Sequence, residues 1–269
     1  MASSPLRATL KRVFRLENRR RAIRRGALER LADFPRTVTI YLPPGYAERE
    51  TTRYPVLYMQ DGQNLFEPER AFVPGEHWRL SEAADDAINE RKAAPMIIVG
   101  VDHAGPGRIE EYTPTHDEKR KAGGKADDYG RLLLEELKPR IDERYRTIAN
   151  DTAIGGSSLG GLVSLHLGLQ HPEVFRAIAA MSPSIWWDDR AILREIETFS
   201  GPRPRIWLDI GGREGAEAMR DARELRERLR GRGWTDANVR FHEDRRADHS
   251  ERAWAKRVRM VLEFLFPPS

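Results

Sequence analysis

The chain has 269 residues, of which 39% are hydrophobic and 33% charged, a composition that supplies enough apolar material for a sizeable core. It contains no cysteine, which excludes disulfide bonds and a thiol nucleophile. No apolar run is long enough to span a bilayer, and the N-terminus lacks the apolar segment of a signal peptide. We therefore expect a cytoplasmic protein without a membrane partner.

Positive charge is concentrated at the N-terminus. Residues 1–36 contain 11 Lys and Arg but 3 Asp and Glu, a net charge of +8, whereas the whole chain has a net charge of +4. One interpretation is an arm that binds nucleic acid or another anionic surface. We favour the other, a solvated, arginine-rich first element, and expect no nucleic-acid partner.

From residue 37 onward, predicted strands alternate with predicted helices. The strands are predicted at residues 37–46, 54–62, 95–103, 152–156, 175–184, 205–212 and 239–244, and the helices at residues 81–93, 127–145, 160–172, 215–233 and 250–266. This alternation indicates an α/β fold with a mostly parallel sheet and helices on both faces. Because the first two strands are close in sequence, we expect the sheet to begin with an antiparallel pair.

Residues 103–130 interrupt this alternation with a long, polar, glycine- and proline-containing stretch. A loop of this length in a compact domain is usually functional or disordered. It leaves the carboxyl end of a predicted strand, where open α/β sheets place their sites. We therefore expect it to lie over the functional site.

The stretch AIGGSSLGGLVSLHLG fits the pattern G-x-S-x-G with Ser158 at its centre, between a predicted strand and a predicted helix. In a nucleophile elbow the serine lies on a strained turn, and its neighbours two positions away must be small because strand and helix approach closely there. Gly156 and Gly160 meet this requirement, and Ser157 is then a spacer. The alternatives are a plain glycine-rich turn and a phosphate-binding loop, but no lysine follows the glycines as the second requires.

A serine nucleophile needs a base, which in this architecture follows it in the chain. Of the later histidines, His166 and His171 lie on the predicted helix directly after Ser158, and His242 lies within a predicted strand. His249 lies in the loop before the last helix, at the sheet edge where a general base is needed. We predict His249 as the base, with His242 as the alternative.

The acid that orients the base is expected after the strand at 205–212. Glu214 follows the end of this strand directly and is our prediction. Asp209, within the strand, is the alternative, and Asp188 and Asp189 after the preceding strand are further options. The oxyanion needs two backbone amides, one from Leu159 and one from the loop after residues 54–62.

The chain resembles the putative-esterase family (esterase D and enterochelin-esterase-like) of α/β-hydrolases in the segments YLPPGY, VLYMQDGQNLF, GSSLGGLVSLHLGLQHPEVF, SPSIWW, LDIGGREG and HSERAW. The resemblance implies an α/β-hydrolase fold without a metal or organic cofactor. It implies Ser158 as nucleophile, Glu214 as acid and His249 as base. It also implies the amide of Gln63 as the second oxyanion donor, and Asp61 as a residue facing the acyl or alcohol side of the pocket. Residues 37–269 are then one catalytic domain, and residues 1–36 an arm or first element.

Substrates of the resembled family include siderophore trilactones, feruloyl esters, S-formylglutathione and mycolyl esters, and a fold does not select among them. Gly-Ser-Ser-Leu-Gly differs from the Gly-His-Ser-Met-Gly of the formylglutathione branch, which argues against thioesters. The missing export signal argues against cell-wall substrates. Aromatic side chains that either line the pocket or simply pack are Trp186, Trp187, Trp78 and Tyr112. Arg108 either binds a polar substrate or pairs with Glu111.

We therefore predict a serine carboxylic ester hydrolase that works through an acyl-enzyme on a small-molecule ester, with aromatic-acyl or siderophore-type esters as candidates. One alternative is acyl transfer to an alcohol on the same scaffold. Another is a non-catalytic binding module that uses the basic arm.

Overall fold

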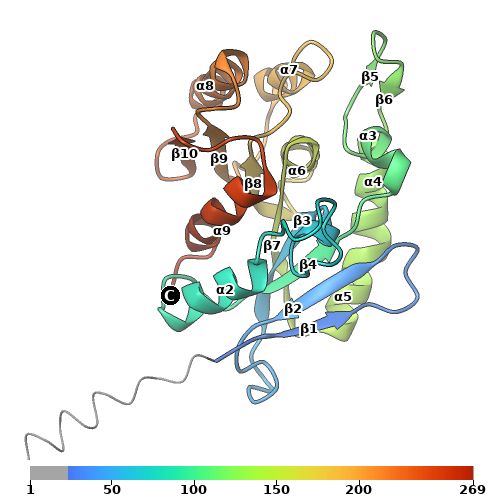
Figure 1. The fold of residues 1–269 in the computed structure, drawn as a ribbon, viewed down its shortest axis with the longest axis vertical. Coiled ribbons are helices and arrows are strands. Elements are labelled where there is room, and N and C mark those ends of the chain that lie inside the picture. The colour runs from blue at the N-terminus through green and yellow to red at the C-terminus, as the bar shows by residue number, and fades with distance from the viewer. Residues whose placement is uncertain (1–23, 269) are drawn as a thin grey trace, which may run out of the picture.

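A computed structural model describes residues 24–268, so most of the predicted arm, residues 1–23, lies outside the described residues. The described chain forms one eight-stranded sheet with helices on both faces (Figure 1). The strands of this sheet are β1 (Ala27–Arg30), β2 (Val38–Leu42), β3 (Tyr54–Gln60), β4 (Ile97–Val101), β7 (Thr147–Ser157), β8 (Phe175–Met181), β9 (Arg205–Gly211) and β10 (Val239–Asp244). A separate hairpin consists of β5 (His116–Asp117) and β6 (Ala122–Gly123).

The α-helices are α2 (Leu80–Asn89), α3 (Arg108–Glu111), α4 (Ala126–Arg131), α5 (Lys138–Arg144), α6 (Leu159–Gln170), α7 (Ala191–Thr198), α8 (Ala216–Gly231) and α9 (Glu251–Leu265). Two short 3₁₀ helices, η1 (Gly62–Asn64) and η2 (Gly105–Gly107), follow β3 and β4, and a π-helical stretch, η3 (Leu132–Leu137), joins α4 to α5. Within residues 24–268, none of the helices combines the length and apolar character that a membrane span requires.

The strand order is β1-β2-β4-β3-β7-β8-β9-β10. All neighbours from β4 to β10 are parallel, whereas β2 is antiparallel to both β1 and β4. The mostly parallel α/β sheet is thus confirmed. The expected pairing of the first two predicted strands is wrong, because β4 lies between β2 and β3. The antiparallel pair at the edge uses β1, which lies inside the segment predicted as an arm or first element.

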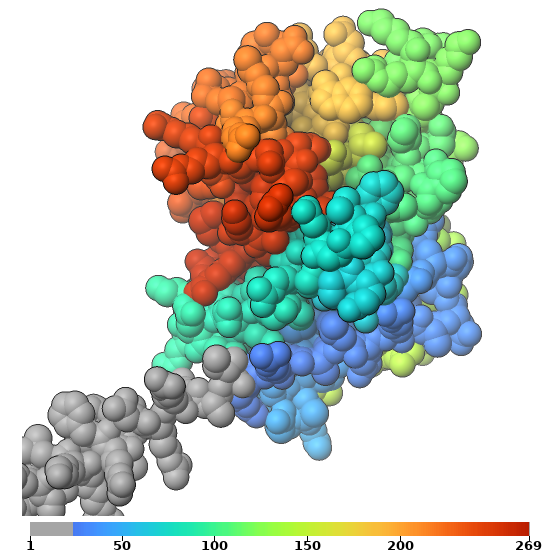
Figure 2. Space-filling model, viewed as in Figure 1, coloured from blue at the N-terminus to red at the C-terminus, as the bar shows by residue number. Residues whose placement is uncertain are grey.

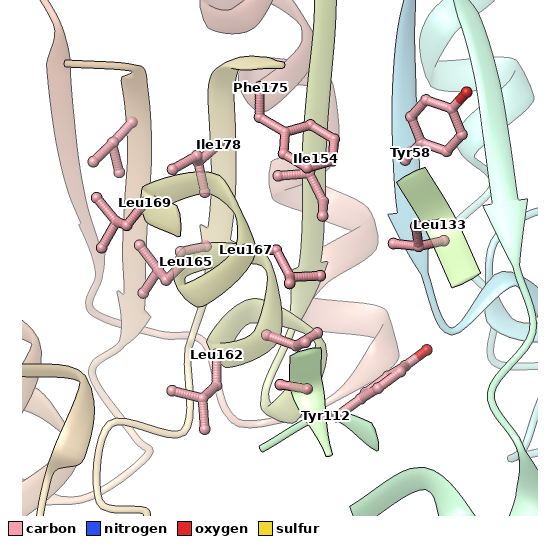
Figure 3. Packing of buried hydrophobic residues seen from close by; sticks show 14 of the residues in the cluster. Tyr58, Tyr112, Leu133, Ile154, Leu162, Leu165, Leu167, Leu169, Phe175 and Ile178 are labelled. Atoms are coloured by element: carbon pink, nitrogen blue, oxygen red, sulfur yellow. The ribbon is translucent and has the colours of Figure 1, made fainter. Parts of the chain in front are cut away.

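Side chains alternate between the two faces of the strands, as period-two geometry requires, and each face builds its own core. On one face, Ile154 and Ile178 pack with α6, and the core continues to α4, α5, α7 and α8. Figure 3 shows the leucines of α6 lying over Ile154, Ile178 and Phe175. On the other face, strand residues such as Leu57 and Met59 pack with α2 and α9. Because α6 is buried almost all round, the residue that begins it has a rigid support.

Residues 103–130 have more structure than the predicted loop. They form η2, α3, the β5–β6 hairpin and the start of α4, and the hairpin extends away from the body of the molecule (Figure 1). Trp187 fixes the hairpin, since its indole N–H donates to the carbonyl of Thr115 at 2.9 Å. Only the first part of the segment, with His103, Gly105 and Arg108, reaches the cavity described below.

Candidate active site

Ser158 lies at the turn between β7 and α6 with φ 57° and ψ −124°, a conformation that is strained for a residue with a side chain. The glycines beside it allow this turn. A Cβ on Gly156 would lie 2.8 Å from the carbonyl carbon of Gly160 and 2.9 Å from Cβ of Gln60. The structure therefore has the strained turn and close strand-helix approach that the G-x-S-x-G pattern predicts.

Three of the predicted residues form a hydrogen-bonded line. The Ser158 hydroxyl lies 3.0 Å from Nε2 of His249, and Nδ1 of His249 lies 2.7 Å from Oε2 of Glu214. Because an ionised carboxylate only accepts, Nδ1–H donates to Glu214 and leaves Nε2 as the acceptor for the serine proton. Trp254 packs its ring edge-to-face with the imidazole at 4.9 Å. The arrangement can therefore take a proton from Ser158.

Glu214 is almost completely buried, with 3% of its side chain exposed. Burial raises the pKa of this carboxyl, but hydrogen bonds from His249, Ser182 and the Gly211 amide outweigh burial and leave the pKa below its ordinary value. The Gly211 N–H donates to Oε1 at 2.8 Å and the Ser182 hydroxyl at 2.6 Å. The carboxylate is thus kept ionised beside the imidazole.

The alternative residues lie elsewhere. Asp209 is fully buried and forms an ion pair with Arg257 at 3.0 Å, so it does not reach the imidazole. His242 lies in β10 against the ring of Trp207. His166 lies in α6 between Glu195 and Asp127, away from Ser158. Asp188 and Asp189 lie in the turn before α7.

The two predicted oxyanion amides both belong to first helical turns. Leu159 is the first residue of α6, and Gln63 is the second residue of η1, positions whose N–H groups have no partner within their helix. Gln63 and Ser158 line the same cavity. Asp61 precedes η1 in a left-handed conformation, and its N–H donates to the hydroxyl of Tyr112 at 3.2 Å. Tyr112 is fully buried, so it supports this turn from below.

A cavity of about 300 Å³ opens beside the serine. Its lining residues are Asp61, Gln63, Asn64, Phe72, His103, Gly105, Arg108, Ser157, Ser158, His249, Glu251 and Trp254. Trp186 is not among them. It is 47% exposed, with the Arg120 guanidinium 4.7 Å above its ring.

Arg108 binds Asp61 through two hydrogen bonds of 2.7 Å, from Nε and Nη2. The predicted pairing of Arg108 with Glu111 is therefore wrong, because Glu111 binds Arg36 instead. The bidentate pair lies at the cavity and fixes the orientation of both side chains there.

Several residues at this site were not singled out from the sequence. Ser184 lies 3.3 Å from the Ser158 hydroxyl, and Ser182 contacts Glu214. Asn64, Phe72 and Glu251 line the cavity. The available signals were their positions, since Ser182 and Ser184 follow β8, Asn64 follows Gln63, and Glu251 follows His249 by two residues. Among residues 24–268, no group of three or more His, Asp or Glu side chains is arranged as metal ligands would be.

The sequence pattern of the Putative esterase family matches residues 31–264 of this chain. A ferri-bacillibactin esterase, BesA, of Bacillus subtilis is 30% identical over 218 residues, which cover 72% of this chain and 73% of the relative. An uncharacterized Bacillus subtilis protein, YbbA, is 25% identical over 256 residues, or 90% of this chain and 97% of the relative.

Solved structures agree on the fold. The siderophore hydrolase EstA from Aspergillus nidulans superposes with a TM-score of 0.68 at 23% identity, over 98% of each chain. A BES protein from Bacillus cereus gives a TM-score of 0.68 at 22% identity, over 90% of this chain and 95% of the other. The chain therefore belongs to the Putative esterase family, has the α/β-hydrolase fold, and is a carboxylic ester hydrolase.

Proposed function

We propose that the chain hydrolyses a small-molecule ester through an acyl-enzyme formed on Ser158. The observation that carries this proposal is the hydrogen-bonded line of Ser158, His249 and Glu214 at the wall of the cavity. A serine hydroxyl becomes an effective nucleophile when an oriented imidazole takes its proton during attack.

In the first half of the reaction, Oγ of Ser158 attacks the ester carbonyl carbon while its proton passes to Nε2 of His249. The amides of Leu159 and Gln63 bind the oxyanion that forms. The tetrahedral species then collapses, the bond to the leaving alkoxy oxygen breaks, and His249 gives its proton to that oxygen. Glu214 stabilises the imidazolium throughout.

In the second half, water attacks the acyl carbon and gives a proton to Nε2 of His249. The bond to Oγ of Ser158 breaks, the proton returns to Oγ, and the free acid leaves. Each half-reaction returns the imidazole to its neutral form, so no further reactant is required.

For the substrate, we propose siderophore-type esters. Support comes from the ferri-bacillibactin esterase as a relative and from the siderophore hydrolase as a structural neighbour. The Asp61–Arg108 pair and the exposed ring of Phe72 at the cavity give it both polar and apolar contacts for such an ester. Asp61 and Arg108 are thus assigned to the binding of substrate, and Tyr112 to the support of Asp61.

The test is hydrolysis of p-nitrophenyl acetate, butyrate and octanoate, methyl ferulate and a catecholate trilactone by the parent protein, Ser158→Ala and Ser200→Ala. Ser200 is exposed and far from the elbow in sequence. Turnover and fluorophosphonate labelling that are lost only in Ser158→Ala would support the nucleophile, and the preferred ester would identify the substrate class. Turnover that persists in Ser158→Ala would refute the proposal.

A further inference from the structure

Glu251 is a partly buried carboxyl in the cavity that the proposed reaction does not use. It is the first residue of α9 and follows His249 by two positions, with Ser250 between them as the N-cap of the helix. It lines the cavity together with Ser158, His249 and Asp61. Its position raises the question of what a third acidic side chain does beside the catalytic groups.

The two oxygens of Glu251 accept hydrogen bonds from different parts of the chain. Asn64 Nδ2 donates to Oε1 at 3.0 Å, and the indole N–H of Trp78 donates to Oε2. Both donors lie more than 170 residues away in sequence. Figure 2 shows the red C-terminal segment in contact with the teal segment that follows β3, and these bonds lie along that contact. Glu251 therefore joins α9 to the segment after β3.

The partner Asn64 directly follows Gln63, whose amide is proposed to bind the oxyanion. Asn64 is the last residue of η1, so fixing its side chain also fixes this short helix. Its other side-chain atom, Oδ1, accepts the Phe72 N–H at 2.9 Å, which sets the position of the ring at the cavity. On the other side, Glu251 begins the helix that follows the His249 loop. One carboxylate thus connects η1, which we call the oxyanion turn, with the His249 loop and, through Asn64, with Phe72 at the rim of the pocket.

Holding both donors at once depends on the ionised form. A carboxylate accepts one N–H on each oxygen, whereas a protonated carboxyl presents an O–H to one of the two donors and loses that bond. The pKa of Glu251 is raised to about 7, mainly by burial and in part by Asp61, while Trp78, Arg108 and His249 oppose the rise. These are the charged and polar groups that face it, together with Asn64 and with His103 in the cavity wall. Its charge therefore changes near neutral pH.

The geometry points to Glu251 as a positioning residue whose carboxylate joins the oxyanion turn to the start of α9, next to the His249 loop. Turnover then requires Glu251 in its ionised form as well as His249 in its unprotonated form. This inference rests on the proposed function, because it assumes that His249 is the base and that the Gln63 amide binds the oxyanion. When Glu251 takes up a proton, one of its two bonds is lost and the oxyanion turn is less well placed.

The experiment measures kcat and KM for p-nitrophenyl butyrate from about pH 5 to about pH 9. The variants are Glu251→Gln and, as a matched control, Glu263→Gln, which makes the same change near the other end of α9, where Glu263 binds Arg259. We expect log kcat of the parent and the control to fall with a limiting slope of two on the acid side. In Glu251→Gln the slope should be one, because the variant lacks the ionisation of Glu251.

Glutamine keeps one acceptor oxygen for two donors, so kcat of Glu251→Gln at about pH 8 should fall roughly tenfold while KM changes by less than about twofold. A parent acid limb with a slope of one, or a slope of two that persists in Glu251→Gln, would overturn the inference. In Trp78→Phe, a second variant, the loss of a bond that lowers the pKa of Glu251 should move the second ionisation to higher pH. An acid limb in Trp78→Phe identical to that of the parent would count equally against it.

Fluorophosphonate labelling separates this inference from the proposed function. If the parent is not labelled at Ser158, the proposed function fails. If the parent and Glu251→Gln are both labelled but share one pH profile, only the role of Glu251 fails. We expect both to be labelled, with the variant reacting about tenfold more slowly at pH 8 because labelling uses the same oxyanion turn.

Discussion

The hydroxyl of Ser182 donates a hydrogen bond to Oε1 of Glu214 at 2.6 Å. Oγ of Ser182 in turn accepts bonds from Nε1 of Trp254 at 3.1 Å and Nη2 of Arg257 at 3.0 Å. Ser182 therefore connects Glu214 with the buried Asp209–Arg257 pair behind it. Glu214 is held by a hydrogen-bond network that extends through the core to α9.

Ser182→Ala should lower kcat about tenfold with little change in KM, because Glu214 loses a hydrogen bond that favours its ionised form while the cavity is left intact. Steady-state kinetics on p-nitrophenyl butyrate test this. Ser200→Ala, at an exposed position, is the control. A Ser182→Ala enzyme with parent kcat would show that Glu214 does not need this bond.

Asp209 and Arg257 form a buried ion pair in which each charge compensates the other, so removing one partner should destabilise the protein. Arg257 is 1% exposed and Asp209 is fully buried, and burial raises the pKa of Asp209 despite the attraction of Arg257. Arg257→Met leaves the carboxylate without its cation and should cost about 3–5 kcal/mol in the free energy of unfolding. Urea denaturation measures this cost. The double variant Asp209→Asn/Arg257→Met should regain much of the loss, and a double variant as unstable as the sum of the single ones would contradict this account.

The elbow should not tolerate a side chain at Gly156. A Cβ there would lie 2.8 Å from two backbone atoms of Gly160, which cannot move without shifting the start of α6. Gly156→Ala should therefore lower kcat by about a hundredfold or more. Gly231→Ala is the matched control, since it ends α8 with open space around it and should raise stability by about 0.5–1 kcal/mol. Full activity in Gly156→Ala would mean that the close approach at the elbow is unnecessary.

The predicted residues Ser158 and Glu214 lie just after β7 and β9, and His249 lies in the loop between β10 and α9, so their positions relative to predicted elements locate them. The supporting residues have no such signal. Ser182, Asn64 and Glu251 gain their roles from partners 32 to 187 residues away, which only the tertiary fold brings together.

The fold shows the same division between local and long-range information. The alternation of strands and helices predicted the layers. It did not predict β1, because all four residues of this strand are exposed and carry no apolar alternation. It also did not give the order of β2, β4 and β3, since β4 inserts between two strands that are close in sequence. A smaller difference concerns the start of α2. The helix begins at Leu80, one residue before the predicted start, and Arg79 is its N-cap.

Phe72 should determine how well long acyl chains bind. Its ring lines the cavity, yet 79% of the residue is exposed, so it has apolar surface free to contact a ligand. Phe72→Ser should raise KM for p-nitrophenyl octanoate about fivefold, corresponding to about 1 kcal/mol of lost apolar contact, and leave KM for the acetate unchanged. Met260→Ser, at an exposed position on α9, is the control. Equal changes in KM for both esters would show that Phe72 does not determine the preference for acyl-chain length.

The last prediction concerns stability and pH at Glu251. Because its pKa in the folded protein is raised from an ordinary 4.5 to about 7, the stability that this group contributes is present below the lower value and is lost as the pH rises through the higher one. Between about pH 5 and about pH 8 the parent should therefore lose about 2–3 kcal/mol relative to Glu251→Gln.

Urea denaturation of the parent, Glu251→Gln and Glu263→Gln at both pH values measures this difference. Any hydrogen bond lost in Glu251→Gln lowers stability at both pH values, whereas the titration acts only between them, so the change with pH isolates the ionisation. Glu263→Gln, with its partner Arg259 on the same helix, gives the background for losing one acidic group. If the gap between the parent and Glu251→Gln does not change with pH, Glu251 titrates outside this range and does not contribute to the acid limb of turnover.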